Sequence, residues 1–274
     1  MVSFTSGQLE ALIVSFFWPF MRLIALMLTA PLFAERAIPQ RVRIGLAIAI
    51  TAVLVPTLPP PPAVHPVSLA GAAILAQQLV IGAALGLAMR IVFVAVETAG
   101  EIAGLQMGLG YATLFDPERA DMIPVLGQFL GLLAILAFLA LDGHLHMVQV
   151  LADTFRILPV SGPGLGRGGF MTLVQWGSEI FTAGVLLALP LLGAMLIANI
   201  ALGILTRAAP QLNLFAVGFP LTLGAGLVIL ALTMPLLAPQ LVKLFGQGYE
   251  MMGQVAGKLV GSDHGKPLNK GINS

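Results

Sequence analysis

The stretch TAGEIAGLQMGLGYATLFDPERAD, residues 98–121, separates an apolar run that ends near Val96 from another that begins at Val125. It contains four glycines, four acidic residues and Pro117. A backbone rich in glycine tends not to form a regular helix, which leaves peptide N–H and C=O groups without hydrogen bonds. Hydrocarbon cannot provide those hydrogen bonds. Such a segment is tolerated at membrane depth only inside protein or along a water-filled path. An ordinary surface loop between two membrane helices is the plainer interpretation of the same pattern.

Residue spacing connects this stretch with the apolar sequence before it. If the preceding helix continues through this stretch, five of its residues lie near one face. They are Arg90, Glu97, Glu101, Gly104 and Gly108, which are separated by seven, four, three and four positions. Arg90 and Glu97 would be about 10 Å apart along the axis, too far for a direct pair. Glycines at every fourth position also allow a neighbouring backbone to approach closely. We therefore expect this face to meet protein or a pore, and not lipid.

The composition defines the class of protein. The chain has 274 residues, of which 58% are hydrophobic and 9% are charged, whereas soluble domains have roughly 25% charged residues. This predicts an all-α integral membrane protein with about six apolar helical segments, several of them short or kinked by proline. A net charge of +1 gives no indication of nucleic-acid binding, and the absence of cysteine excludes disulfides and thiolate sites. The N-terminus has no positively charged n-region, so no secretory signal peptide is predicted.

The first two apolar runs contain the first candidate charges. Residues 11–33 are long enough to span a bilayer but include Pro19 and Arg22. A mid-span arginine costs about 2.5–3.5 kcal/mol on insertion scales, so Arg22 should face protein or water. The next run, residues 44–58, extends only about 22 Å, short of the ~30 Å hydrocarbon core. Between them lies a basic loop that the positive-inside bias places in the cytoplasm, with Arg36, Arg41 and Arg43.

The last third predicts a helical hairpin. Residues 170–205 and 214–237 are apolar runs interrupted by prolines, and they flank a polar turn with Arg207 that we expect to be cytoplasmic. The tail that follows is polar and basic. About six crossings from an outside N-terminus return this tail to the outside, whereas its lysines favour the inside, and the sequence leaves both open.

No segment predicts a cofactor or metal site. His144 and His146 diverge by about 200° on a helix, so a shared metal would need further ligands, and loop or interface histidines are the simpler interpretation. The glycine-rich residues 162–169 fit neither a dinucleotide-binding fingerprint nor a Walker motif. We expect no cofactor and no metal.

Two further classes of function can be weighed against the residues. A secondary transporter or ion channel could use Arg22, Arg90, Glu97 and Glu101 as an ion path, but no second half of the chain repeats their pattern. An intramembrane hydrolase would need a nucleophile with its base or a set of metal ligands, and no such motif occurs. We therefore expect no enzymatic activity.

Four stretches in order carry a resemblance to one family. They are ERAIPQRVRIGLA (residues 35–47), TAGEIAGLQMGL with YATLFDP (98–117), LDGH (141–144) and APQLNLFAVGFPL (209–221). Together they resemble the FliR family of flagellar type III export-gate proteins, from the N-terminus to about Leu244. The injectisome counterparts of this family are similar at one remove and are an alternative.

The resemblance implies a fold, a location and partners. It implies a single membrane domain over residues 1–245, with a FliP-like part (1–165) followed by a FliQ-like hairpin (170–245), and a polar basic tail (246–274). Such proteins assemble with several copies of FliP and FliQ in the bacterial inner membrane, at the flagellar basal body. Unfolded flagellar subunits pass through the resulting gate, and a FlhB-like protein is a further partner.

The resemblance also implies a plug loop over residues 104–116 that blocks the pore until export begins. Its pore-facing candidates in this chain are Gly104, Met107, Gly108, Leu109, Gly110, Tyr111, Leu114, Phe115 and Asp116. The chain departs from the family pattern at Leu114, where an aromatic residue often stands. The side chains of the plug are therefore expected to be arranged differently here, with Tyr111 and Phe115 as the neighbouring aromatics.

Overall fold

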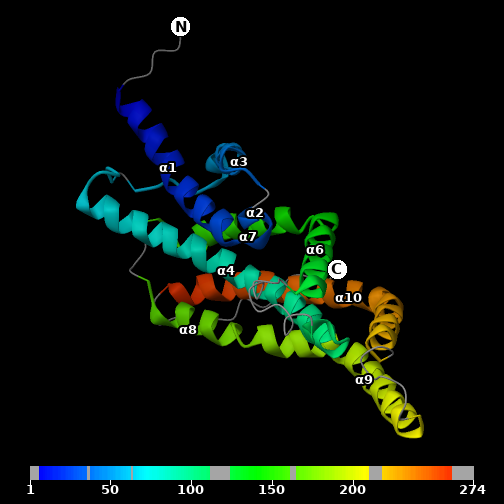
Figure 1. Cartoon of the computed structure of the whole chain (residues 1–274). Coiled ribbons are helices and arrows are strands. Elements are labelled where there is room, and N and C mark those ends of the chain that lie inside the picture. Colours follow the sequence, from blue (N-terminus) through cyan, green and yellow to red (C-terminus); the bar gives the residue numbers. More distant parts are fainter. Residues whose placement is uncertain are drawn as a thin grey trace, which may run out of the picture. The chain divides into compact units, whose positions relative to one another are not determined.

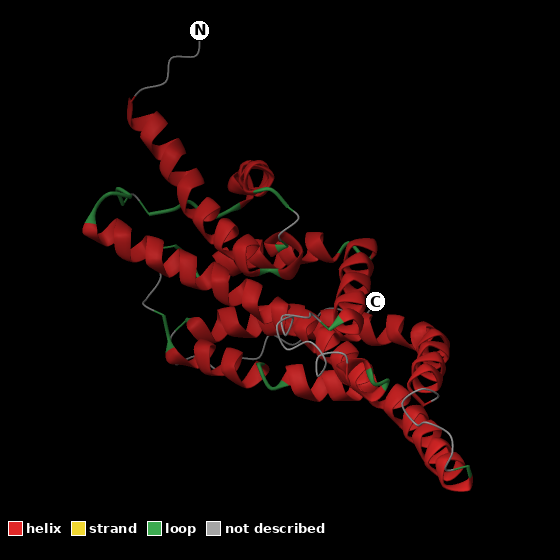
Figure 2. Cartoon of the chain, in the orientation of Figure 1, coloured by secondary structure: helices red, strands yellow, loops and turns green. Residues whose placement is uncertain are grey.

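The structure is a computed structural model that describes residues 6–35, 38–62, 64–111, 124–160, 165–209 and 218–260. These residues form helices joined by short connections, and no strand occurs among them (Figure 2). The prediction of an all-α protein is confirmed. Figure 1 labels the α-helices. The elements are α1 (Ser6–Thr29), α2 (Pro31–Ala34), α3 (Gln40–Leu54), η1 (Val55–Thr57), α4 (Leu69–Gln106), η2 (Leu109–Tyr111), α6 (Val125–Ala140), α7 (Gly143–Ile157), α8 (Arg167–Trp176), α9 (Glu179–Ala208) and α10 (Phe219–Leu259).

Within the described ranges, five helical segments are long and apolar enough to cross a membrane, or six if the bent pair α6 and α7 forms one span. This agrees with the expected number of about six. The helix α4 has 38 residues, about 57 Å at 1.5 Å per residue, which is nearly twice the ~30 Å hydrocarbon core. Standing upright, α4 would therefore extend well beyond the hydrocarbon.

Two boundaries differ from the sequence prediction. The apolar run after residue 170 is divided into α8 and α9 by a turn at Gly177 and Ser178. The last helix continues through Pro235 and Pro239 to Leu259, beyond residue 246 where the tail was expected to begin. Proline interrupts membrane helices less than the sequence suggests, because neighbouring helices and local adjustments satisfy the freed carbonyl groups.

The chain folds as two compact units. Unit 1 contains the described residues of 1–87, 148–175 and 250–274, and unit 2 those of 88–147 and 176–249. Each boundary between them falls within a helix: α4, α7, α8 or α10.

In unit 1, α1 and α4 cross where two glycines of α4 allow close approach. A side chain at Gly82 would collide with the carbonyl oxygen of Arg22, and one at Gly86 would collide with the hydroxyl of Thr29. The Thr29 hydroxyl also lies 3.2 Å from the carbonyl oxygen of Ala83, to which it donates. Small residues thus permit a polar contact between two otherwise apolar helices.

Unit 2 is built around the C-terminal half of α4. Its aromatic core joins Phe93 of α4, Phe138 of α6 and Phe245 of α10, with ring centroids 5.2–5.5 Å apart. The indole N–H of Trp176 donates to the carbonyl oxygen of Ala88 at 2.9 Å, which ties the α8–α9 turn to α4. Edge-on and tilted ring contacts of this kind add stability beyond the apolar area that they bury.

Candidate functional site

Arg22 lies at the centre of unit 1, and its side chain is fully buried. Its Nε donates to Oε1 of Gln78 at 2.8 Å, one terminal nitrogen donates to the hydroxyl of Thr154 at 3.1 Å, and the other donates to the carbonyl oxygen of Leu158 at 2.9 Å. The guanidinium carbon also lies 3.9 Å from the centroid of the Phe155 ring. A single side chain therefore connects α1, α4 and the C-terminal end of α7.

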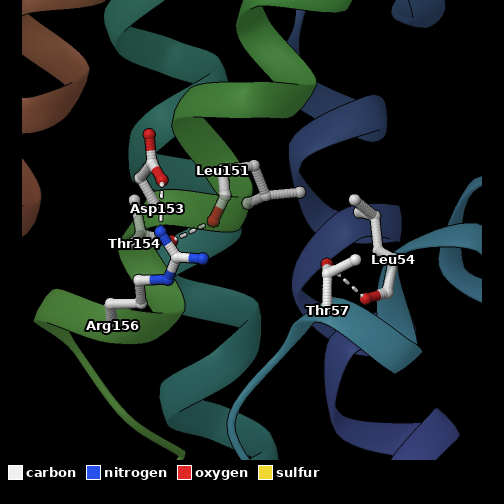
Figure 3. Close-up of polar contacts among 6 residues, drawn as sticks. All are labelled: Leu54, Thr57, Leu151, Asp153, Thr154 and Arg156. Atoms are coloured by element: carbon white, nitrogen blue, oxygen red, sulfur yellow. Dashed lines mark hydrogen bonds and ion pairs between the residues drawn. The ribbon is translucent and has the colours of Figure 1, made fainter.

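The buried charge of Arg22 is stabilised without a carboxylate among these contacts. The helix α7 ends at Ile157, so the carbonyl of Leu158 belongs to the negative end of the helix dipole, where a cation is stabilised. The Phe155 ring adds a cation–π contact. The Thr154 hydroxyl donates to the carbonyl oxygen of Leu151 at 2.6 Å (Figure 3), which leaves its lone pairs available to Arg22. These neutral acceptors and the helix end replace the acidic partner that a buried arginine otherwise needs.

Exposed charged side chains lie on the other side of the α7 C-terminus. Arg156 and Asp153 form an ion pair at 3.7 Å there, with side chains 71% and 55% exposed (Figure 3). Such an exposed pair contributes little to stability. The same helix end thus carries one arginine that pairs at the surface and accepts another in the interior of unit 1.

The α4–α6 crossing in unit 2 is made by glycines on both helices. A Cβ added at Gly100 would lie 2.6 Å from the Cα of Gly127, and one at Gly127 would lie 3.0 Å from the carbonyl oxygen of Glu97. The Glu97 side chain lies alongside Gly131. The expectation that this glycine face receives a neighbouring backbone is confirmed, and the neighbour is α6 of the same chain.

The helix α4 ends before the predicted plug region is complete. Gly108 follows the helix with φ 87°, a left-handed conformation that favours glycine. Gly108 is therefore outside the helix, contrary to the expectation that the helix continues through it. The side chain of Met107 is fully buried and lies against Gly226 of α10, where a Cβ would collide with it.

Other candidate plug residues lie near this helix end. The hydroxyl of Thr222 donates to the carbonyl oxygen of Met107 at 3.4 Å. A Cβ at Gly104 would be 3.6 Å from Leu109, and one at Gly110 would be 2.7 Å from Leu105. The side chain of Tyr111 lies outside the described part of the structure, as do the residues Leu114, Phe115 and Asp116.

The predicted charged residues of α4 are not brought together as a group. Arg90 and Glu101 are both exposed, and Glu97 is half-buried. Among the cytoplasmic-tip candidates, Arg41 and Arg207 are exposed, and Arg43 donates to the carbonyl oxygen of Glu35 at 3.3 Å. Arg36 lies outside the described residues.

Sequence reasoning missed the polar partners at the α6–α7 bend. The two helices meet at 70°, and Asp142 adopts φ 54° at the break. The hydroxyl of Tyr249 donates to the carbonyl oxygen of Gly143 at 3.2 Å, and the His146 ring stacks on Tyr249 with centroids 5.8 Å apart. The LDGH motif (residues 141–144) spans this bend, but only the fold brings Tyr249 to it. No group of three or more metal-ligating side chains occurs among the described residues.

Comparison with known proteins identifies the family of this chain. The family described as "Bacterial export proteins, family 1" matches residues 13–248. The chain is 44% identical over 263 residues to the flagellar biosynthetic protein FliR of Pectobacterium carotovorum subsp. carotovorum, covering 96% of this chain and 100% of that protein. This chain belongs to the FliR family. It is also 44% identical over 259 residues to FliR of Escherichia coli strain K12, covering 94% and 99% of the two chains. FliR of Bacillus subtilis strain 168 is 28% identical over 245 residues, covering 87% of this chain and 93% of the relative.

Membership of the FliR family and the apolar helices together identify a flagellar membrane protein of the export apparatus. The family is one of export components.

Proposed function

We propose that this chain forms, with FliP- and FliQ-like proteins, the pore through which unfolded flagellar subunits cross the bacterial inner membrane. The observation that carries the proposal is the similarity to FliR proteins over nearly the whole chain. A flagellar export component embedded in the membrane must provide or join a path for polypeptide. A FlhB-like protein is a further expected partner.

The burial pattern supports assembly with other subunits. Only 11% of the apolar window of α10 and 22% of that of α8–α9 is buried within the chain, against 67% for α4. Lipid tails could cover these apolar faces, whereas the exposed charges Arg90 and Glu101 of α4 require water, lipid headgroups or an oppositely charged partner. Partner subunits can cover both kinds of surface.

Co-purification tests the proposed assembly. A tagged chain extracted in mild detergent should carry FliP- and FliQ-like proteins, identified by mass, in several copies each. Expressed without them, the chain should aggregate or be degraded, and co-expression should rescue it. A monodisperse and thermally robust monomer obtained without partners would contradict the proposal.

Within this pore, we propose that residues 104–116 act as the plug. The left-handed Gly108 allows the chain to turn away from α4, and Met107 anchors the start of the stretch against Gly226 of α10. Apolar side chains such as Leu109 can exclude water and ions from a narrow pore.

Deletion of residues 109–115 tests the plug. The deletion should raise permeability to small ions or solutes in membranes that contain the assembled complex. Because the chain has no cysteine, single cysteines can be labelled against a clean background. A cysteine at Leu109 should react slowly in the resting gate and faster while a substrate is exported. A deletion complex that assembles without leaking, together with equal labelling in both states, would mean that the stretch is an ordinary loop.

A further inference from the structure

The C-terminal half of α4 is covered on three sides within unit 2. Gly100 packs against Gly127 of α6, Gly184 of α9 lies against the carbonyl oxygen of Ala95, and Phe245 of α10 contacts Phe93. Among the described residues, the fourth side is the least covered. Its residues are Arg90, Val94, Glu101 and Leu105, which we call the α4 seam.

The α4 seam has the width of one helix. At 100° per residue its four members fall within about 60° of one another around the α4 axis. Arg90 and Glu101 are exposed, Val94 is half-buried, and Leu105 is 67% exposed. Charged and apolar side chains thus alternate along a stripe as narrow as the seam of a coiled coil.

The charges of the seam indicate what can cover it. Among the described residues, neither Arg90 nor Glu101 has an ion pair. Residues 69–89 contain no charged side chain and measure about 31 Å as a helix, enough to cross the hydrocarbon core. Arg90 then lies at or beyond the hydrocarbon boundary, and the seam lies where protein can replace water. Lipid tails therefore do not reach the charges of the seam, whereas an oppositely charged protein surface would complement them.

Two copies of this chain cannot pair through their seams. Arg90 and Glu101 are 11 residues apart, about 16 Å along the axis. Copies that share one orientation in a bilayer are related by a two-fold axis along its normal, which would bring Arg90 against Arg90 and Glu101 against Glu101. Like charges in contact oppose association. Pairing of two seams is therefore disfavoured, and a different chain is the better match for this surface.

We propose that the α4 seam docks one helix of another subunit, which presents an acidic residue opposite Arg90 and a basic residue about 16 Å further along, opposite Glu101. The opposite charges at the two ends of the seam fix the direction of that helix, and Val94 and Leu105 supply the apolar contact between them. This inference rests on the proposed pore assembly and adds the chemistry by which a partner is recognised.

Charge reversal in the assembled complex tests the seam. Arg90→Glu and Glu101→Lys should each reduce the FliP- and FliQ-like proteins recovered with the tagged chain by about tenfold. Lys243→Glu, at an exposed cation of α10 outside the seam, is the matched control and should leave recovery unchanged. Normal recovery with both seam variants would overturn the inference while leaving the proposed function intact. Failure of the wild-type chain to recover any partner would instead contradict the proposed function.

A cysteine at Val94 distinguishes the possible occupants. Membranes from cells that express the chain alone or with its partners would be treated with a membrane-impermeant thiol reagent. Protection only in the presence of partners supports the inference. Labelling with and without partners would indicate that water lines the seam. Protection in both cases would indicate that lipid or residues 112–123 of the same chain cover the seam. Either result overturns the inference. Cross-linking of position 94 to cysteines introduced along partner helices would identify the acidic residue opposite Arg90. Replacement of that residue by lysine should then restore partner recovery with Arg90→Glu.

Discussion

Arg22 and Arg90 occupy contrasting environments in two apolar helices of one chain. Arg22 in unit 1 is fully buried, and all three of its guanidinium nitrogens donate within the chain. Arg90 in unit 2 is exposed on the uncovered seam of α4. The difference shows that an arginine in a membrane helix serves the fold when its acceptors come from the same chain. In the docking that we propose at the α4 seam, an arginine whose acceptors come from outside the chain serves assembly instead.

The largest effect is expected from Arg22→Leu. This change leaves the acceptors on Gln78, Thr154 and Leu158 buried without a donor, and such orphaned groups cost on the order of 3 kcal/mol in total. The α1 helix would insert more easily, yet assembly and export should fail. Thermal unfolding of the purified complex, with motility as the cellular assay, measures the effect.

Arg156→Leu is the control for this variant, because Arg156 is exposed and its loss should change stability by less than about 0.5 kcal/mol. Normal complex yield and motility with Arg22→Leu would show that the polar cluster of unit 1 is dispensable, and the contrast with Arg90 would disappear.

The second largest effect is expected at the crossing of α4 and α6. Gly100→Ala places a Cβ 2.6 Å from the Cα of Gly127, so α4 and α6 must separate. Overpacking of this kind costs roughly 1–3 kcal/mol. Gly193→Ala is the control, since nothing lies within 4 Å of a Cβ there, and it should be neutral or slightly stabilising. Equal unfolding temperatures for the two variants would refute close packing at this crossing.

A smaller effect is expected from Tyr249→Phe, which removes one neutral hydrogen bond in unit 2. The hydroxyl donates to the carbonyl oxygen of Gly143 at 3.2 Å, and its loss should cost about 1 kcal/mol. Comparison with Arg22→Leu then shows how much more a charged, fully buried donor contributes than a neutral one. A loss as large as that for Arg22→Leu would mean that the α6–α7 bend, and not Arg22, is the critical polar contact.

The smallest effect on stability is expected from Arg90→Gln. Arg90 is exposed and has no ion pair among the described residues, so its replacement should change the free energy of unfolding of the chain by less than about 0.5 kcal/mol. Recovery of partner subunits should nevertheless fall, which separates assembly from folding. If unfolding temperature and partner recovery fell together, Arg90 would belong to the fold in the same way as Arg22.

The sequence by itself determined the class of this protein. Its apolar runs required membrane helices, a mid-span arginine required a protein or water environment, and four ordered motifs indicated the FliR family. These conclusions rest on local chemistry, because the cost of a charge or of an open peptide group in hydrocarbon depends little on the rest of the fold.

Only the tertiary structure decided which groups meet. The spacing of Arg22 could not reveal that its acceptors are Gln78, Thr154 and Leu158, because those residues are more than fifty positions away in the chain. The glycines of α4 predicted a close neighbour, but only the fold shows that α6 is that neighbour. Prolines in α9 and α10 suggested breaks, yet both helices continue through them. Burial is a property of three-dimensional contacts, and so the distinction between a satisfied Arg22 and an uncovered Arg90 appears only when the helices are assembled.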